Sequence, residues 1–529
     1  MMQKRVAKYL IALVFAGSVV DTAVARAQSA TTTPIQHLVV IFQENVSFDH
    51  YFGTYPNALN PAKEPRFVAA PGTPSVDGLS GALLHNNPNK LNSENGTGKS
   101  NPFRLDRSQI ETADQDHEYE AEQRAFHGGL MDLFPKYTGM PGPPPAGHDT
   151  RGLVMGYFDG NTVTAFWNYA QRFAMSDNSH GTNFGSSSVG AVNLISGQTN
   201  GVIDHIDALS DLVPDGGGGY TMIATIDPIG DVCTPSSQAQ VKMGGTNVGD
   251  LLNSSGVSWG FFSGGFDLNT KNPNGSTGCR RTHKSAITGE GDIDYQPHHE
   301  PFQFYASTAN LKHTRPSSPS TVGMAGDPAN HQYDLQDFYN ALAVGNFPAV
   351  SFLKAPSYQD GHAGYSNPLD EQAFVVNLIN LLQQQKDWAS TAVIIAYDDS
   401  DGWYDHQMAP IVNQSASEKD ALTGPGECGK GENTLPGVTV AHAQGRCGYG
   451  PRLPLLVISP YAKRNYVDHS LTDQSSILRF IEDNWLDGQR IHGSFDAIAG
   501  TLNGMFDFDN AGNDSPYLLN PSTGEVVTQ

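Results

Sequence analysis

The chain has 529 residues and a formal net charge of −23 at pH 7, and only 16% of its residues are charged. A protein this acidic repels nucleic acid and anionic membrane surfaces, and we therefore expect no nucleic-acid partner. An anionic substrate would need a cation to attract it to the protein. The 56 glycines and 33 prolines, with so few charges, indicate a folded protein with long ordered loops and exclude a disordered one.

The N-terminus has the layout of a secretory signal peptide. Basic residues come first, an apolar run from Leu10 to Val20 follows, and the small residues around Arg26 form a cleavage site after Ala27. We therefore expect a signal peptide at 1–27, export to a periplasm or the extracellular space, and a single mature domain at 28–529. The apolar run is too short to span a bilayer and no later segment qualifies, so we expect no stable membrane insertion.

Apolar runs alternate with helical patterns along the rest of the chain. Strands are expected at His37–Phe42, Tyr220–Thr225, Val257–Phe262, Ala349–Leu353, Thr391–Tyr397 and Leu453–Ser459. Helices are expected from about Leu369 to Trp388 and around 477–485, where Thr472 and Asp473 are candidate caps. Continuous apolar strands are typical of sheets covered on both faces, so this alternation predicts an α/β fold with a mainly parallel central sheet and helices on both sides.

Segments rich in Gly, Pro, Asn and Ser separate these elements, at about 57–107, 138–147, 267–330 and 413–447. We expect long inserted loops there, roofing a site and shaping substrate choice. Four cysteines lie in such stretches, and in an exported protein they indicate two disulfides. Of the three possible connectivities we expect the nearest-neighbour one, Cys233–Cys279 and Cys428–Cys447.

Two predicted strands break into acidic and amide residues where they end. Glu44 and Asn45 follow the strand that begins at His37, and Asp398 and Asp399 follow the one that ends at Tyr397. In an open α/β sheet the side chains beyond the carboxyl ends of strands meet in one crevice, where ligands bind. Carboxylate and amide oxygens without thiolates suit a hard divalent cation, so the sequence predicts a metal-dependent enzyme.

A segment of small and hydroxyl residues, 181–190, leads into an apolar stretch that looks helical. A hydroxyl at a helix start lies beside free amide N–H groups and the positive end of the helix dipole, a setting that favours a phosphoryl group. Contact with a cation would make that hydroxyl a nucleophile. From this segment alone, a plain N-cap in a serine-rich turn is the simpler interpretation.

Histidines in the loops are candidate phosphate ligands, general acids or ligands of a second metal: His117, His298, His299 and His362. Taken singly, each is more often a structural or surface histidine. Asp370 opens the predicted helix, where a carboxylate also has a purely structural role at the positive end of the dipole.

Seven segments occur in the same order as in a known family: Glu44–Gly53, Asp116-His117, 181–190, Pro297–Phe302, Gln359–His362, Leu369–Gln372 and Tyr397–Gly402. With Arg452-Leu453-Pro454 and Val457–Pro460 they resemble the bacterial phosphoesterase family that contains acid phosphatases and phospholipases C, over roughly residues 35 to 490.

The resemblance implies an alkaline-phosphatase-like three-layer sandwich and several residue roles. It implies a divalent metal (Ca, Mg, Mn or Zn) held by Glu44, Asn45, Asp398, Asp399 and the nucleophilic hydroxyl. That hydroxyl is Ser187 by its position in the motif, with Ser186 and Ser188 as competitors. His117, His299 and His362 would contact the phosphoryl group with Asp370 supporting them, His298 is the alternative to His299, and His362 or His299 would protonate the leaving alcohol.

Three functions follow, and the first is hydrolysis of phosphate monoesters through a phosphoserine, as in the acid phosphatases. A serine nucleophile favours it, as does a chain that ends about forty residues after Trp485, too short for the β domains that follow in many phospholipases C. The alternative is a phospholipase C that cleaves phospholipid phosphodiesters. The third is a non-catalytic cation-binding surface protein. The substrate, the metal and the oligomeric state are not indicated by the sequence.

Overall fold

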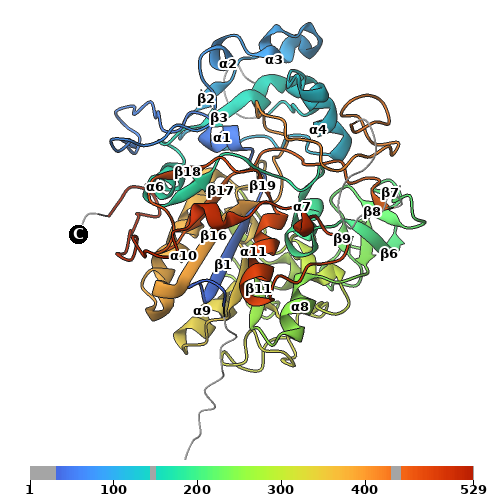
Figure 1. Cartoon of the computed structure of the whole chain (residues 1–529), viewed down its shortest axis with the longest axis vertical. Coiled ribbons are helices and arrows are strands. Elements are labelled where there is room, and N and C mark those ends of the chain that lie inside the picture. Colours follow the sequence, from blue (N-terminus) through green and yellow to red (C-terminus); the bar gives the residue numbers. More distant parts are fainter. Residues whose placement is uncertain (1–30, 143–149, 430–441, 528–529) are drawn as a thin grey trace, which may run out of the picture.

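A computed structural model describes residues 31–142, 150–429 and 442–527 of the chain (Figure 1). The expected signal peptide at 1–27 lies outside the described residues, as does part of the 413–447 segment. Of the helices in the described ranges, none combines the length and the apolar character that a membrane span requires.

An eight-stranded sheet is the largest in the described ranges and forms the centre of the fold. Its order is β14 (Gln332–Asp334), β11 (Trp259–Ser263), β15 (Val350–Lys354), β1 (His37–Gln43), β16 (Thr391–Tyr397), β17 (Leu455–Ile458), β4 (Ala174–Ser176) and β18 (Tyr466–Asp468). Neighbouring strands are parallel except on both sides of β17, which runs against the others. The expected mainly parallel sheet is therefore confirmed.

Helices cover both faces of this sheet (Figure 1). On one side α7 (Ser187–Ser196), α8 (Val248–Ser254) and α11 (Ser475–Trp485) pack together, and α6 (Thr164–Arg172) packs with α10 (Pro368–Leu382). Every residue of β1 and β16 is buried, as their unbroken apolar sequences require for strands between two helical layers. This is the α/β sandwich that the sequence predicts.

Further helices and small sheets surround this sandwich. The helices are α1 (Phe48–Phe52), α2 (Ala82–His85), α3 (Pro88–Leu91), α4 (Tyr119–Phe126), α5 (Phe134–Tyr137) and α9 (Leu335–Ala343), and the paired strands are β2 (Phe103–Leu105) with β3 (Gly156–Phe158), β5 (Ser179–His180) with β19 (Thr472–Asp473), and β12 (Thr282–Lys284) with β13 (Gly291–Ile293). Several lie within segments expected to be loops, so these insertions are ordered.

Three expectations about elements need correction. The run at 220–225 forms β8 (Tyr220–Met222) in a separate sheet of β7 (Leu212–Pro214), β8, β6 (Asn200–Ile206), β10 (Gln240–Met243) and β9 (Asp227–Pro228), because an apolar run does not specify its partner strand. Helix α10 ends at Leu382 and not near Trp388, which lies in a 3₁₀ turn. Thr472 and Asp473 form β19 and Gln474 occupies the N-cap position of α11, although Asp473 does accept the backbone N–H of Ser475 at 3.1 Å.

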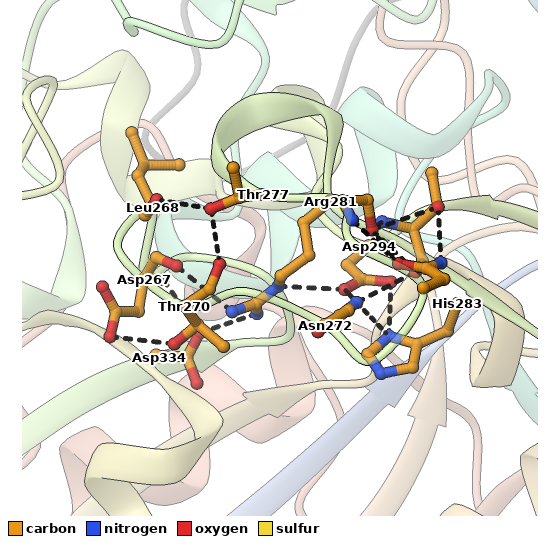
Figure 2. A network of polar contacts seen from close by, with 12 residues as sticks. Asp267, Leu268, Thr270, Asn272, Thr277, Arg281, His283, Asp294 and Asp334 are labelled. Carbon is orange, nitrogen blue, oxygen red and sulfur yellow. Dashed lines mark hydrogen bonds and ion pairs between the residues drawn. The ribbon is translucent and has the colours of Figure 1, made fainter.

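Both disulfides form as expected, Cys233–Cys279 and Cys428–Cys447. The 267–330 insertion is also held by a buried arginine (Figure 2). Arg281 contacts Asp294 at 3.0 Å and Asp334 at 3.2 Å, and its guanidinium donates to the carbonyl of Asp267 at 3.1 Å. Because Asp334 ends β14, these ion pairs fasten the insertion to the edge of the central sheet.

Candidate active site

The registers of β1 and β16 bring the two acidic segments together. Gln43 pairs with Tyr397, so the next residues of the two strands, Glu44 and Asp398, lie side by side at the carboxyl edge of the sheet. The N-terminus of α7 reaches the same point. Its first residue, Ser187, has its hydroxyl oxygen 3.2 Å from Glu44 Oε2 and 3.3 Å from Asp399 Oδ2. Three segments that are distant in the sequence therefore meet at one serine hydroxyl.

Each of the two aspartates accepts backbone N–H groups with one carboxylate oxygen and not with the other. Asp398 Oδ1 accepts the backbone N–H groups of Asn45 at 3.1 Å and Asp399 at 2.8 Å, whereas its Oδ2 is buried with no hydrogen-bond partner among the described residues. Asp399 Oδ1 accepts the N–H of Asp401 at 2.7 Å, and its Oδ2 lies near Ser187. The side-chain oxygen of Asn45 is also buried and, in the described chain, unpartnered.

These donors are of the chemical type that a divalent cation binds. Buried oxygens without a hydrogen-bond partner are costly, and a hard cation satisfies several at once. Burial first, and the charge of Asp398 second, raise the pKa of Asp399 to about 7, which is the electrostatic strain that a bound cation relieves. Glu44, Asn45, Asp398, Asp399 and Ser187 stay the residues predicted to hold the metal. Among the described residues, Asp114, His117, His362 and Asp401 have ligand atoms within 4.8 Å of one another, whereas Glu44, Asp398 and Asp399 do not form such a group.

The structure distinguishes the three consecutive serines. The Ser188 hydroxyl bonds both the carbonyl (2.9 Å) and the N–H (3.0 Å) of Ile226. Ser186 occupies the N-cap position of α7 without making a capping bond, and its hydroxyl is buried with no partner in the part of the chain described. Ser187 alone of the three contacts the carboxylates. The simpler N-cap interpretation therefore does not explain this hydroxyl.

A glycine allows the helix to come this close. A Cβ on Gly190, one turn into α7, would collide with the carbonyl oxygen of Asp398. Only a residue without a side chain lets the helix backbone pack against the end of β16 here. This is the physical reason for a glycine three residues after Ser187.

His117 is the histidine of this site whose protonated form the neighbouring carboxylates favour. Its Nε2 lies 3.4 Å from Asn45 Nδ2, and its Nδ1 lies 2.9 Å from the carbonyl of Gln115 and 3.4 Å from Asp401 Oδ1. Burial by itself lowers the pKa of His117, but the carboxylates of Asp399 and Asp401 outweigh it and raise that pKa well above 6.5. These two carboxylates therefore favour the protonated form of the ring.

The other two predicted histidines are neutral. His299 lies 3.5 Å from Glu44 Oε1, and burial together with the neighbouring His298 lowers its pKa well below 6.5. His362 has its ring centroid 5.9 Å from that of His117, and burial lowers its pKa to about 4. His298 turns to Asp227 instead, at 3.0 Å, so of the pair it is His299 that contacts the carboxylate cluster.

Asp370 lies at the start of α10, and its carboxylate bonds to residues outside the carboxylate cluster. Its Oδ2 accepts from Asn367, the N-cap residue, at 2.6 Å and from Ser285 at 2.5 Å. The β12–β13 hairpin, which flanks Ser285, thereby rests on the helix that follows His362. These contacts match the structural alternative for Asp370, and its support of the histidines stays a prediction.

Two residues near the cluster were not assigned from the sequence. Lys354 ends β15 and contacts Glu44 Oε1, and Asp401 holds both Asn45 and His117. The same strand-end rule would have found Lys354, because the run predicted at 349–353 stops directly before it. Asp401 lies within the acidic turn, and nothing in the sequence distinguishes it from its neighbours as a partner of His117.

A buried arginine ties the two acidic segments together below the site. Arg452 pairs with Asp49 at 3.0 Å and with Asp405 at 3.1 Å, and its guanidinium lies 4.3 Å from the ring centroid of Phe48. His406 also contacts Asp49, at 2.7 Å. The Arg452-Leu453-Pro454 segment thus has a structural role: it locks the turns that follow β1 and β16.

Comparisons with known proteins show what this chain is similar to. The chain is 24% identical over 517 residues to the non-hemolytic phospholipase C of Burkholderia pseudomallei, covering 94% of this chain and 62% of that protein. It is 24% identical over 518 residues to phospholipase C A of Mycobacterium tuberculosis, covering 93% and 81%. The chain therefore spans about three fifths of the length of the first of these relatives. Among solved structures, a mutant of the alkaline phosphatase PafA aligns with a TM-score of 0.32 and 11% identity, over 65% of this chain and 94% of that one. The Phosphoesterase family matches residues 35–486, so the chain belongs to the phosphoesterase family.

Proposed function

We propose that this protein is a metal-dependent hydrolase of phosphate monoesters that works through a phosphoserine intermediate. The observation that carries the proposal is the position of the Ser187 hydroxyl, within 3.3 Å of two carboxylates, at the start of a ten-residue helix. The free N–H groups and dipole at that helix start favour a phosphoryl group. A cation held by Glu44, Asn45, Asp398 and Asp399 would supply Lewis acidity and favour the alkoxide of Ser187.

In this mechanism Ser187 attacks phosphorus as its alkoxide, and the P–O bond to the alcohol breaks as the leaving oxygen takes a proton from His117. Water later attacks the phosphoserine, returns a proton to His117, and releases phosphate and the serine. His117 hydrogen-bonds a phosphoryl oxygen and is the candidate proton donor to the leaving oxygen, with Asp401 beside its Nδ1. This assignment differs from the expectation that His362 or His299 is the acid, because the low pKa values of those two rings make them neutral near pH 7. They serve as acceptors that orient the attacking water.

The test compares neighbouring serines. Ser187→Ala should lower the rate of p-nitrophenyl phosphate hydrolysis about a thousandfold or more, since the nucleophile is lost. Ser186→Ala is the matched control: it removes an adjacent buried hydroxyl that makes no hydrogen bond to the described residues, so its rate should stay within about threefold of wild type. Equal losses in the two variants, both folded by circular dichroism, would contradict the assignment of Ser187.

A second candidate is a phospholipase C activity, favoured by the relatives named above. Both activities use the same serine and cation and differ in whether the phosphoryl group carries a second ester. Hydrolysis of p-nitrophenyl phosphate and of its phosphorylcholine ester, measured side by side, separates the two. If neither ester is hydrolysed in the presence of divalent cations, the non-catalytic cation-binding role takes the place of both. Export, expected from residues 1–27, is tested by cell fractionation.

A further inference from the structure

Helix α4 buries one of its glutamates beside the active site. The helix begins at Tyr119, and His117 lies two residues before that start. Glu120 lies on the exposed face and donates nothing to the site, because its carboxylate accepts from Arg124 at 2.9 Å. Glu122, by contrast, is only 1% exposed. A buried carboxyl group is costly unless its oxygens have hydrogen-bond partners, so the partners of Glu122 indicate what this residue does.

The two oxygens of Glu122 contact two different loops of the site. Oε1 accepts the hydroxyl of Ser400 at 2.6 Å, and that hydroxyl in turn accepts the backbone N–H of Gly402 at 3.0 Å. Oε2 lies 3.5 Å from the backbone nitrogen of Gly185, two residues before Ser187. One side chain of α4 therefore contacts both the acidic turn at 398–402 and the loop that leads into α7.

The acidic turn has a backbone conformation that requires such support. Asp401 has a φ of 54° and Gly402 a φ of 68°, so two consecutive residues lie in the left-handed region, which is costly for a residue with a side chain. A Cβ on Gly402 would collide with the carbonyl oxygen of Asp116, so the segment before α4 passes directly over this turn. Asp401 Oδ1 also lies 3.4 Å from Nδ1 of His117. The position of the turn against α4 therefore sets where His117 lies relative to the carboxylates.

We propose that Glu122 is a positioning residue for the proposed reaction: by binding Ser400 it fixes the acidic turn against α4 and so keeps His117 in place. The inference rests on the proposed function, because it concerns the proton donor of that reaction. Protonation of the leaving oxygen matters more when that oxygen is more basic. A displaced His117 should therefore slow hydrolysis of an aliphatic ester more than hydrolysis of a nitrophenyl ester, whose alcohol leaves as a stable anion.

The test compares hydrolysis of glycerol 2-phosphate with that of p-nitrophenyl phosphate. Glu122→Ala removes the acceptor of the Ser400 hydroxyl, and it should lower kcat for glycerol phosphate about a hundredfold and kcat for p-nitrophenyl phosphate about tenfold or less. Glu122→Gln keeps an oxygen for Ser400, so both rates should stay within about fivefold of wild type. Glu120→Ala, on the exposed face of the same helix, is the matched control and should change both rates by less than about twofold.

Ser400→Ala removes the other partner of the same hydrogen bond. It should reproduce the difference between the two esters, and it decides the question by itself if Glu122→Ala does not fold. In the double variant Glu122→Ala/Ser400→Ala the two losses should not multiply, because both substitutions break one bond.

Equal losses on the two esters, no rescue by Glu122→Gln, or losses that multiply in the double variant would each overturn the inference and leave the proposed function standing. A wild-type protein that hydrolyses neither monoester in the presence of divalent cations would refute the proposed function, and the inference with it. The wild-type rates therefore separate the two failures.

Discussion

Replacing Asp398 by Asn should change the stability of the metal-free protein and its cation affinity in opposite directions. The side chain keeps its shape, and its oxygen can still accept the N–H groups of Asn45 and Asp399. The outer atom, however, becomes an uncharged NH₂ that cannot bind a cation. The substitution thus removes a repulsive charge beside Asp399 and, at the same time, one metal ligand.

The size of the stability gain follows from the pKa of Asp399. Its rise from 3.8 to about 7 corresponds to about 4 kcal/mol for ionising this buried group at neutral pH in the metal-free protein. Burial is the larger cause and the charge of Asp398 the next, so Asn should recover about 1–2 kcal/mol. Because the folded pKa of this carboxyl is raised, metal-free wild type should lose stability as pH rises from 4 to 7, and the variant should lose less.

Urea unfolding in EDTA at pH 5 and pH 7 measures the stability change, and calorimetric titration measures the cation affinity, which should fall about a hundredfold or more. Asp49→Asn is the matched control. Burial would raise the pKa of Asp49, but His406 and Arg452 hold it below its usual value, so the same substitution there should destabilise. If Asp398→Asn destabilises the metal-free protein, or binds the cation as wild type does, the reasoning about the cluster is wrong.

Two further predictions concern the lock below the site. Arg452→Met should lower the free energy of unfolding by about 3–5 kcal/mol, because it leaves the buried carboxylates of Asp49 and Asp405 without their cation. The control, Arg66→Met at an exposed position, should change the free energy of unfolding by less than about 0.5 kcal/mol. Burial lowers the pKa of His406, but Asp49 outweighs burial and raises that pKa to about 9. This histidine should therefore stabilise the fold by up to about 3 kcal/mol below pH 6.5. It should lose that contribution as the pH rises through 9. In His406→Gln, the free energy of unfolding in urea should change less with pH between 6.5 and 9 than in wild type. If it changes as steeply as in the exposed-site control His85→Gln, His406 does not make this contribution.

Local sequence was sufficient for the main elements and for half of the site. An unbroken apolar run followed by acidic residues indicates a buried strand that ends at a ligand crevice, and this rule placed Glu44 and Asp398 correctly at one edge of the sheet. It worked because both faces of β1 and β16 are buried, so composition alone marks their bounds. Cysteine spacing in loop-rich stretches likewise predicted both disulfides.

Local sequence was insufficient wherever the answer depends on a neighbour across the fold. An apolar run such as 220–222 is suited to a strand of either sheet, and long-range packing decides which sheet it joins. Ser186, Ser187 and Ser188 have the same chemistry, and only the direction of each hydroxyl at the start of α7 distinguishes them. The sequence by itself thus determined which residue types reach the carboxyl edge of the sheet. The tertiary structure decided which of their oxygens are held by N–H groups or by Lys354 and which remain to bind a ligand, because those partners come from strands and turns far away in the chain.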